Sequence, residues 1–170
     1  MLMSRVRVLM ANRPHCMIAT YAILLIGSAA YYMLNYMLPA STEDRLTVQR
    51  VVLDEMIHPA GGGFHAGQPI PFLSDKVDDY DALIAHQLTS GIQLGRGDAW
   101  TEDASHHVID AQNGVPGVVL WLNIESILAR RACIMSATNG GPLYGVVCRY
   151  WLQKHVGHWI IVARDVILLA

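Results

Sequence analysis

The sequence is short of charged residues. Lysine and arginine together number 12 and aspartate and glutamate 14, so charged residues fill 15% of the 170 positions, against about 25% in ordinary globular proteins. Hydrophobic residues make up 53% of the chain, which excludes a disordered protein because disorder requires low hydrophobicity and high net charge. The formal net charge of −2 provides no basic field that would attract nucleic acid. We therefore expect no nucleic-acid partner.

The signatures of common catalytic and cofactor sites are also missing. The chain contains no phosphate-binding G-x-x-x-x-G-K-S/T loop, no G-x-G-x-x-G dinucleotide fingerprint and no G-x-S-x-G nucleophile elbow. We expect no cofactor and no catalytic residue, and hence a protein that is not an enzyme.

Eight histidines are the remaining candidates for chemistry, but their spacing does not match a metal site. Zinc requires three or four ligands that converge on one point, and the chain has no H-E-x-x-H or H-x-H sequence. We expect no metal site, with one built from histidines far apart in the sequence as the alternative. The histidines are His15, His58, His65, His86, His106, His107, His155 and His158.

Cysteine is scarce, with three in the chain. If the apolar C-terminal third forms a hairpin that turns on Gly140 and Gly141, then Cys133 and Cys148 face each other across the two strands. A non-hydrogen-bonded pair brings Cα atoms to about 4.5 Å, within disulfide range. The sequence predicts a structural disulfide between Cys133 and Cys148, with two reduced, buried cysteines as the alternative. The chain has no C-x-x-C sequence, so its cysteine spacing does not indicate redox catalysis.

What the chain does contain is one long apolar run. Residues 16–39 include no charged side chain, and 17–38 supplies the roughly 20 apolar residues that a helix needs to cross about 30 Å of hydrocarbon. We expect a transmembrane helix over 17–38, with the lipid bilayer as a partner. Aromatic side chains, which favour the membrane interface, cluster at its far end: Tyr31, Tyr32 and Tyr36.

The flanks of this run predict its orientation. Arginines precede it and acidic residues follow it, and the positive side stays in the cytoplasm. Ten of the twelve basic residues are arginine, a bias typical of GC-rich bacterial genomes. We expect a single-pass protein of the bacterial inner membrane with a cytoplasmic N-terminus and a periplasmic C-terminal domain. The alternative is a signal peptide cleaved near Ser41, but cleaved h-regions span only 7–15 residues.

Small residues form a patch within the apolar run. Gly27, Ser28 and Ala30 would allow a second helix to approach closely. We name these three as candidates for helix packing, although small residues are common in membrane helices without such a role.

The expected organisation has four parts. They are a cytoplasmic tail over 1–16, the transmembrane helix over 17–38, a juxtamembrane helix over 39–58 and an exported domain over 59–170. Helical spacing of apolar residues predicts a helix from about 43 to 57 and a second helix from 74 or 75 to about 90, with a loop up to 71 between them. Apolar, β-branched segments in the last third predict an antiparallel β-meander that ends with a strand over 158–169. Over residues 123–131 the helix and strand patterns tie, with Ile124, Ile127 and Leu128 mildly favouring a helix. The fold class is therefore α+β, with the helices first.

This order of elements resembles the VirB8-like inner-membrane subunits of type IV secretion systems, whose periplasmic domain is NTF2-like. The resemblance is one of element order and rests on no motif. It implies a structural component of an envelope-spanning machine of the secretion, conjugation or pilus type. Its partners would be other membrane or periplasmic subunits, or further copies of itself in a homo-oligomer. The alternative function is a tethered or exported small-ligand-binding protein or a metal-dependent enzyme that uses the histidines.

Overall fold

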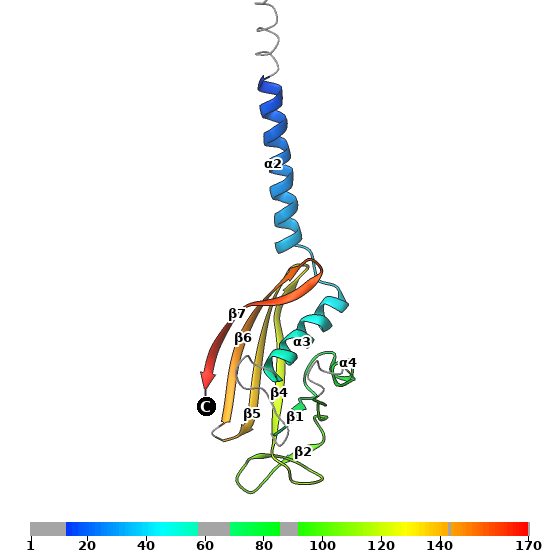
Figure 1. The fold of residues 1–170 in the computed structure, drawn as a ribbon, viewed down its shortest axis with the longest axis vertical. Helices are drawn as coiled ribbons and strands as arrows, with labels where there is room; N and C mark the ends of the chain where they lie inside the picture. The colour runs from blue at the N-terminus through cyan, green and yellow to red at the C-terminus, as the bar shows by residue number, and fades with distance from the viewer. Residues whose placement is uncertain (1–12, 58–68, 86–91, 143, 170) are drawn as a thin grey trace, which may run out of the picture. The chain divides into compact units, whose positions relative to one another are not determined.

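The computed structural model describes residues 13–57, 69–85, 92–142 and 144–169 (Figure 1). The chain divides into two compact units, Met1–Leu38 and Pro39–Ala170. In the first unit, helix α2 runs over Arg13–Tyr36, and the side chains of residues 18–34 are exposed. Within the described part of the chain, no helix meets the length and apolar character needed to cross a membrane. Of the expected span 17–38, Met17, Asn35 and Tyr36 lie outside the described side chains.

Helix α3, Thr42–Ile57, opens the second unit and confirms the helix expected over about 43–57. A capping box begins it, since the Asp44 backbone N–H donates to the Ser41 hydroxyl at 3.0 Å and the Ser41 backbone N–H donates to Asp44 Oδ2 at 3.4 Å. The Ser41 hydroxyl also donates to Asp44 Oδ2 at 2.9 Å. Apolar side chains recur three and four residues apart along the helix and bury one face. The fully buried ones are Val48, Val52, Leu53 and Ile57.

A five-stranded sheet follows, in the order β1-β4-β5-β6-β7. Strands β4 to β7 form the expected antiparallel meander, and β1 adds to it in parallel, so the sheet is mixed. The α+β class with the helices first is confirmed, and residues 123–128 are resolved as strand. The strands are β1 Ile70–Leu73, β4 Gly117–Leu128, β5 Arg131–Gly141, β6 Tyr144–His155 and β7 His158–Leu169.

Strand β1 corrects the expectation of a loop up to residue 71. The Phe72 side chain, 1% exposed, lies so close to Gly95 and Gly117 that an added Cβ at either glycine would collide with its ring. The absence of a side chain at these two glycines therefore leaves space for the Phe72 ring. Burial of the ring stabilises β1 and offsets the weak strand propensity of the proline-rich sequence. Strand β1 depends on these contacts between segments distant in the sequence, so the local sequence pattern around residue 71 could not predict it.

The remaining elements are short. Helix α4, Tyr80–Ile84, is shorter than the helix expected from 74 or 75 to about 90, of which 86–90 lies outside the described residues. Strands β2, Trp100–Glu102, and β3, Val108–Asp110, pair antiparallel in a separate small sheet.

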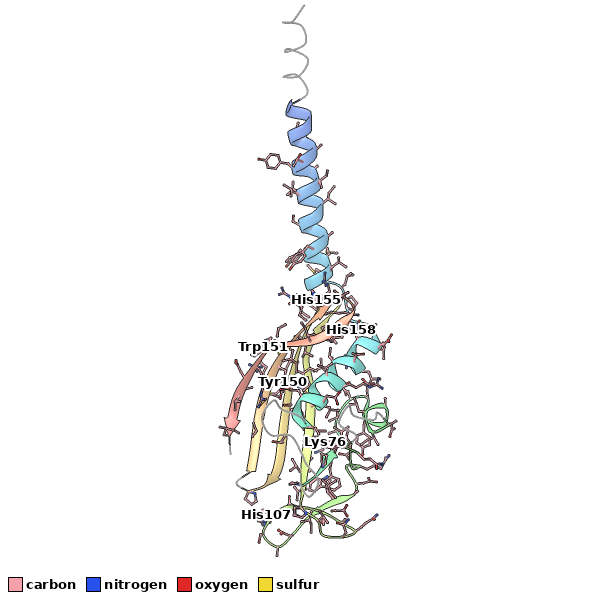
Figure 2. All side chains as sticks on the ribbon, viewed as in Figure 1. Lys76, His107, Tyr150, Trp151, His155 and His158 are labelled. Atoms are coloured by element: carbon pink, nitrogen blue, oxygen red, sulfur yellow. The ribbon has the colours of Figure 1, made fainter. Side chains whose placement is uncertain are left out.

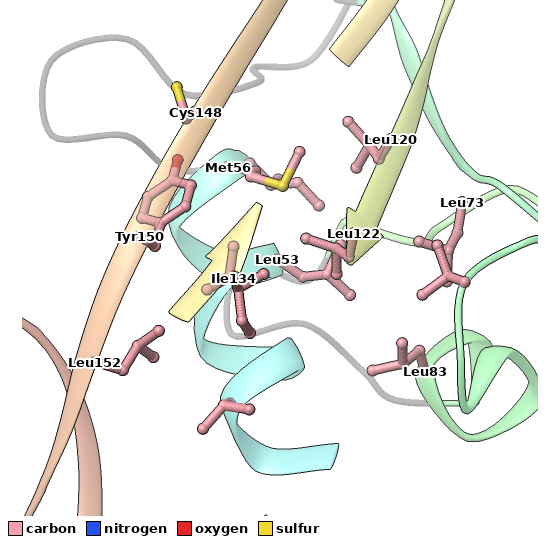
Figure 3. Packing of buried hydrophobic residues seen from close by; sticks show 14 of the residues in the cluster. Leu53, Met56, Leu73, Leu83, Leu120, Leu122, Ile134, Cys148, Tyr150 and Leu152 are labelled. Carbon is pink, nitrogen blue, oxygen red and sulfur yellow. The ribbon is translucent and has the colours of Figure 1, made fainter. Parts of the chain in front are cut away.

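The core lies between α3 and one face of the large sheet. Figure 3 shows Leu53 and Met56 of the helix facing side chains of β4, β5 and β6. The buried residues alternate along β4, β5 and β6, so the side chains between them lie on the opposite face of the sheet. We call that second face the outer face; its residues include Trp121, Glu125, Cys133, Arg149 and Trp151.

The predicted disulfide is wrong. In the β5–β6 hairpin, Cys133 pairs with Trp151 and Cys148 with Ser136, so the register is displaced by three residues from the expected one. An odd displacement places the two cysteines on opposite faces of the sheet, and both are free. The physical reason is that β5 continues through Gly141, which pairs with Tyr144. The chain therefore reverses after the two glycines and not on them.

Candidate functional site

Strand β7 is last in the strand order and forms one edge of the sheet. Its two ends differ in how they are covered. We call residues 158–161 the pinned half and residues 162–169 the open half. In Figure 2, His158 marks the start of the pinned half, close to His155 across the β6–β7 turn.

The pinned half is held by the start of α3. Trp159 is 5% exposed, and its indole Nε1 donates to Asp44 Oδ1 at 2.8 Å. Lys154 Nζ donates to the same oxygen at 2.6 Å. Burial alone would raise the Asp44 pKa, but hydrogen bonds from Lys154, Trp159 and Ser41 outweigh it and lower the pKa from 3.8 to about 2.

All eight residues of the open half are exposed. Its only charged side chains are Arg164 and Asp165, although edge strands are usually protected from other chains by charge, proline or short length. Shifts in the β6–β7 register leave Val162 and Ile167 outside the pairing, as expected of bulges at a sheet edge. The exposed apolar residues of the open half are Val162, Val166, Ile167, Leu168 and Leu169.

A pocket of about 640 Å³ lies beside the open half, on the face of the sheet that carries the core. Its volume is in the range of small-molecule sites, roughly 300–1,000 Å³. The end of α3, the β2–β3 region and strands β4 to β7 contribute to its wall. The apolar part of this wall includes Met56, Val108, Ile109, Val118 and Val146.

Hydrogen-bond donors gather at one side of the pocket. Strand pairing places Ser136 opposite Cys148 and Tyr150 opposite Arg164, so the four side chains are neighbours on one sheet face. The Arg164 guanidinium lies over the Tyr150 ring, 5.8 Å from its centre. Burial raises the pKa of the Tyr150 phenol to about 12, so the phenol keeps its proton at neutral pH. We call these four residues the donor patch.

Two carboxylates also line the pocket. Glu55 Oε1 is 3.9 Å from Arg164 Nη1. Asp103 Oδ1 accepts the backbone N–H groups of His107 at 2.9 Å and Ser105 at 2.8 Å. These two bonds are the main cause of a lowered Asp103 pKa. The Asp103 charge is therefore compensated by its own loop.

The other residues singled out by the sequence do not converge on a site. Among described residues, no group of three or more His, Cys, Asp or Glu could hold a metal ion. His107 lies at the opposite end of the second unit from His155 and His158 (Figure 2). His58, His65 and His86 lie outside the described residues, as does the side chain of His15.

The three helix-packing candidates are exposed on α2. An added Cβ at Gly27 would meet nothing within 4 Å, and the Ser28 hydroxyl donates to the Leu25 carbonyl at 2.9 Å. A role of Gly27, Ser28 and Ala30 in helix packing stays a prediction.

The sequence indicated neither the open half as a sheet edge nor the donor patch. The apolar, β-branched composition of 158–169 indicated a strand, but an edge is a property of sheet order. The donor patch depends on register, which the sequence predicted incorrectly. Comparison with protein-family models, with curated proteins and with solved structures found no match for this chain.

Proposed function

We propose that the chain is a membrane-anchored assembly component, not an enzyme, which binds a partner protein through the open half of β7. The observation that carries the proposal is the exposed apolar edge at 162–169, where Leu168 and Leu169 are 56% and 73% exposed. Unpaired backbone N–H and C=O groups along such an edge are a template for an added strand.

The opposite edge of the same sheet supports this assignment by contrast. Strand β1 is four residues long, and Pro71, Phe72 and Leu73 are buried. Short length and burial protect an edge against pairing with other chains. Strand β7 has twelve residues and neither protection along its open half.

The partner that fits the open half is an extended, apolar segment of another membrane or periplasmic subunit. Backbone hydrogen bonds would supply affinity, and the alternating apolar side chains of the added strand would pack beside Val166 and Leu168. A strongly charged segment fits less well because the open half offers only one residue of each charge.

The anchor in this proposal is the apolar run over 17–38, and it rests on the sequence. Charge-free length, flanking arginines and tyrosines at the far end favour a single span with the N-terminus in the cytoplasm. The folded unit would then be periplasmic, in the inner membrane of a bacterium. A curved sheet with one helix and a pocket on the same face supports an NTF2-like, VirB8-like arrangement as its finer fold class.

Site-specific photo-crosslinking in cells tests the docking strand. A benzoylphenylalanine in place of Leu168 should form an adduct with one membrane or periplasmic protein, through an extended apolar segment identified by mass spectrometry. The matched control carries the same photoreactive residue in place of Val115, which is 40% exposed and lies outside the strands. That position should give no such adduct.

Lysine substitution provides the second readout. Replacing Ile167 and Leu168 by lysine should abolish the adduct formed from a photoreactive residue at 169, while Val115→Lys should leave it. No adduct at 168, or the same adducts at 168 and 115, would overturn the docking strand. An adduct to a second copy of the chain would replace the separate partner by a homo-oligomer.

The second candidate function, small-ligand binding, is favoured by the pocket of about 640 Å³ beside β7. It is compatible with an assembly role because the pocket wall and the open half share only Arg164.

A further inference from the structure

The pocket beside β7 is chemically divided. The donor patch of Ser136, Cys148, Tyr150 and Arg164 occupies one side, and apolar side chains from α3, β3, β4 and β6 occupy much of the rest. Ser136 and Tyr150 are each 2% exposed and Cys148 is 3% exposed, so these three side chains are largely removed from bulk water, while the Arg164 side chain is 38% exposed. A polar group placed there would interact in a low-dielectric environment.

Arg164 sets the charge of the donor patch. Among the described residues that line the pocket, it is the one side chain with a permanent positive charge. Its nearest carboxylate oxygen, on Glu55, is 3.9 Å away, beyond hydrogen-bond distance. A guanidinium carries five N–H donors; that of Arg164 forms a hydrogen bond with the Cys148 sulfur and lies over the Tyr150 ring. Donors of Arg164 therefore remain for a ligand acceptor.

The other donors of the patch favour the same type of ligand group. The Tyr150 phenol and the Ser136 hydroxyl form a hydrogen bond with each other, and one of the two protons is then left to donate outward. The Cys148 thiol is a weaker donor beside them. One free hydroxyl proton and the weak thiol donor beside a guanidinium match the oxygens of a carboxylate or sulfonate.

We propose that this pocket binds a small organic anion with an apolar body, its acidic group at the donor patch and its body against Met56, Val118 and Val146. The site differs from the docking strand of the proposed function. The Arg164 guanidinium holds the acidic group in a two-bond geometry, and Glu55 limits the ligand to a single negative charge at this end.

Isothermal titration of the purified full chain with two probes of the same shape tests the proposal. Naphthalene-2-carboxylate carries the anion, and naphthalene-2-carboxamide is its neutral counterpart. The carboxylate should bind at one site per chain and at least about tenfold more tightly than the amide, as expected when a charged hydrogen bond replaces a neutral one.

Three variants assign the site. Arg164→Gln should remove most of the difference between the two probes, and Arg164→Lys should restore part of it. Arg149→Gln is the matched control, because Arg149 lies on the outer face and pairs with Glu125 at 2.8 and 3.0 Å. It should leave both affinities within about twofold. Thr138→Phe, which places a ring in the pocket wall, should abolish binding of both probes while the circular dichroism spectrum stays unchanged.

Several results would overturn the proposal. Equal affinity for the two probes, no binding of either, or tighter binding of the cation naphthalen-2-ylmethylammonium would each remove the anion assignment. Binding that survives Thr138→Phe in a folded variant would place the probes elsewhere on the protein. Loss of photo-crosslinking at Leu168 would leave these titrations unaffected, so the two proposals fail separately.

Discussion

The two halves of β7 belong to one strand, yet the rest of the fold covers only one of them. In the pinned half, Trp159 is 5% exposed and shares the Asp44 carboxylate with Lys154. In the open half, every side chain is exposed. Both halves pair with β6, apart from Val162 and Ile167 at the two bulges, so the contrast comes mainly from packing and not from the sheet hydrogen bonds.

The contrast shows how a single helix divides a strand into a structural part and an available part. The N-terminus of α3 carries both the capping box and the acceptor for Trp159. The first turn of the helix therefore holds the strand ends next to the β6–β7 turn. Beyond Ile161 every residue of β7 is exposed, and apolar residues there stabilise the fold little. Exposed apolar side chains lower the solubility of a protein, and we therefore infer that a partner covers these residues.

Removing the pinned side chain should have the largest effect on stability. Trp159→Ala should lower the free energy of unfolding by about 3–5 kcal/mol, because it leaves a cavity and removes one donor from Asp44. Leu168→Ala in the open half should change it by less than about 0.5 kcal/mol. Urea denaturation followed by circular dichroism measures both, and similar losses for the two variants would erase the distinction between the halves.

The Asp44 carboxylate should make the pinned half sensitive to acid. Its folded-state pKa of about 2 lies below the ordinary 3.8, so its contribution is fully present above pH about 4 and is lost as the pH falls through 2. The Asp44 side chain is only 14% exposed, so solvent screens its interactions little. The lowered pKa then corresponds to a contribution on the order of 2 kcal/mol to the free energy of unfolding.

Asp44→Asn should therefore destabilise the protein at pH 7, and the gap to the wild type should narrow between pH 4 and pH 2. The matched variant Glu43→Gln alters an exposed carboxylate one residue earlier and should show a small gap with little pH dependence. Denaturation curves at several pH values measure the gap. A gap for Asp44→Asn that stays constant down to pH 2 would show that its charge does not pin β7.

The elements that could be predicted from the sequence are those with a strong local pattern. Apolar spacing and cap residues indicated α3, and β-branched composition with the turn at Val156 and Gly157 indicated β7 at its observed bounds. These features depend on residues within one turn of helix or one strand, so a single sequence contains them.

What could not be predicted depends on contacts between distant segments. Strand β1 exists because Gly95 and Gly117 admit the Phe72 ring, and the hairpin register depends on where β5 ends. The register in turn decides which side chains share a face, so the donor patch of Ser136, Cys148, Tyr150 and Arg164 could not be assembled before the pairing was known.

The two cysteines give the smallest expected effect on stability, and both lie in line with the open half of β7. Cys133 is opposite Trp151, which pairs with Ala163, and Cys148 is opposite Val166. Because the two lie on opposite sheet faces, both should be alkylated in urea without reductant, and reductant should shift the melting temperature by less than about 1 °C. A mass consistent with a Cys133–Cys148 bridge would contradict the observed register.

The native reactivity of Cys133 sharpens this last test. Burial and then the nearby Glu125 carboxylate raise the pKa of the Cys133 thiol from 9.0 to about 11, and the thiol donates to Glu125 Oε2 at 3.1 Å. Since the thiolate is the reactive form, its alkylation at pH 8 should be about a hundredfold slower than that of an ordinary cysteine. Glu125→Gln removes the carboxylate charge and should accelerate this reaction. An unchanged rate would mean that Glu125 does not control the thiol, and would weaken the assignment of both residues to the outer face.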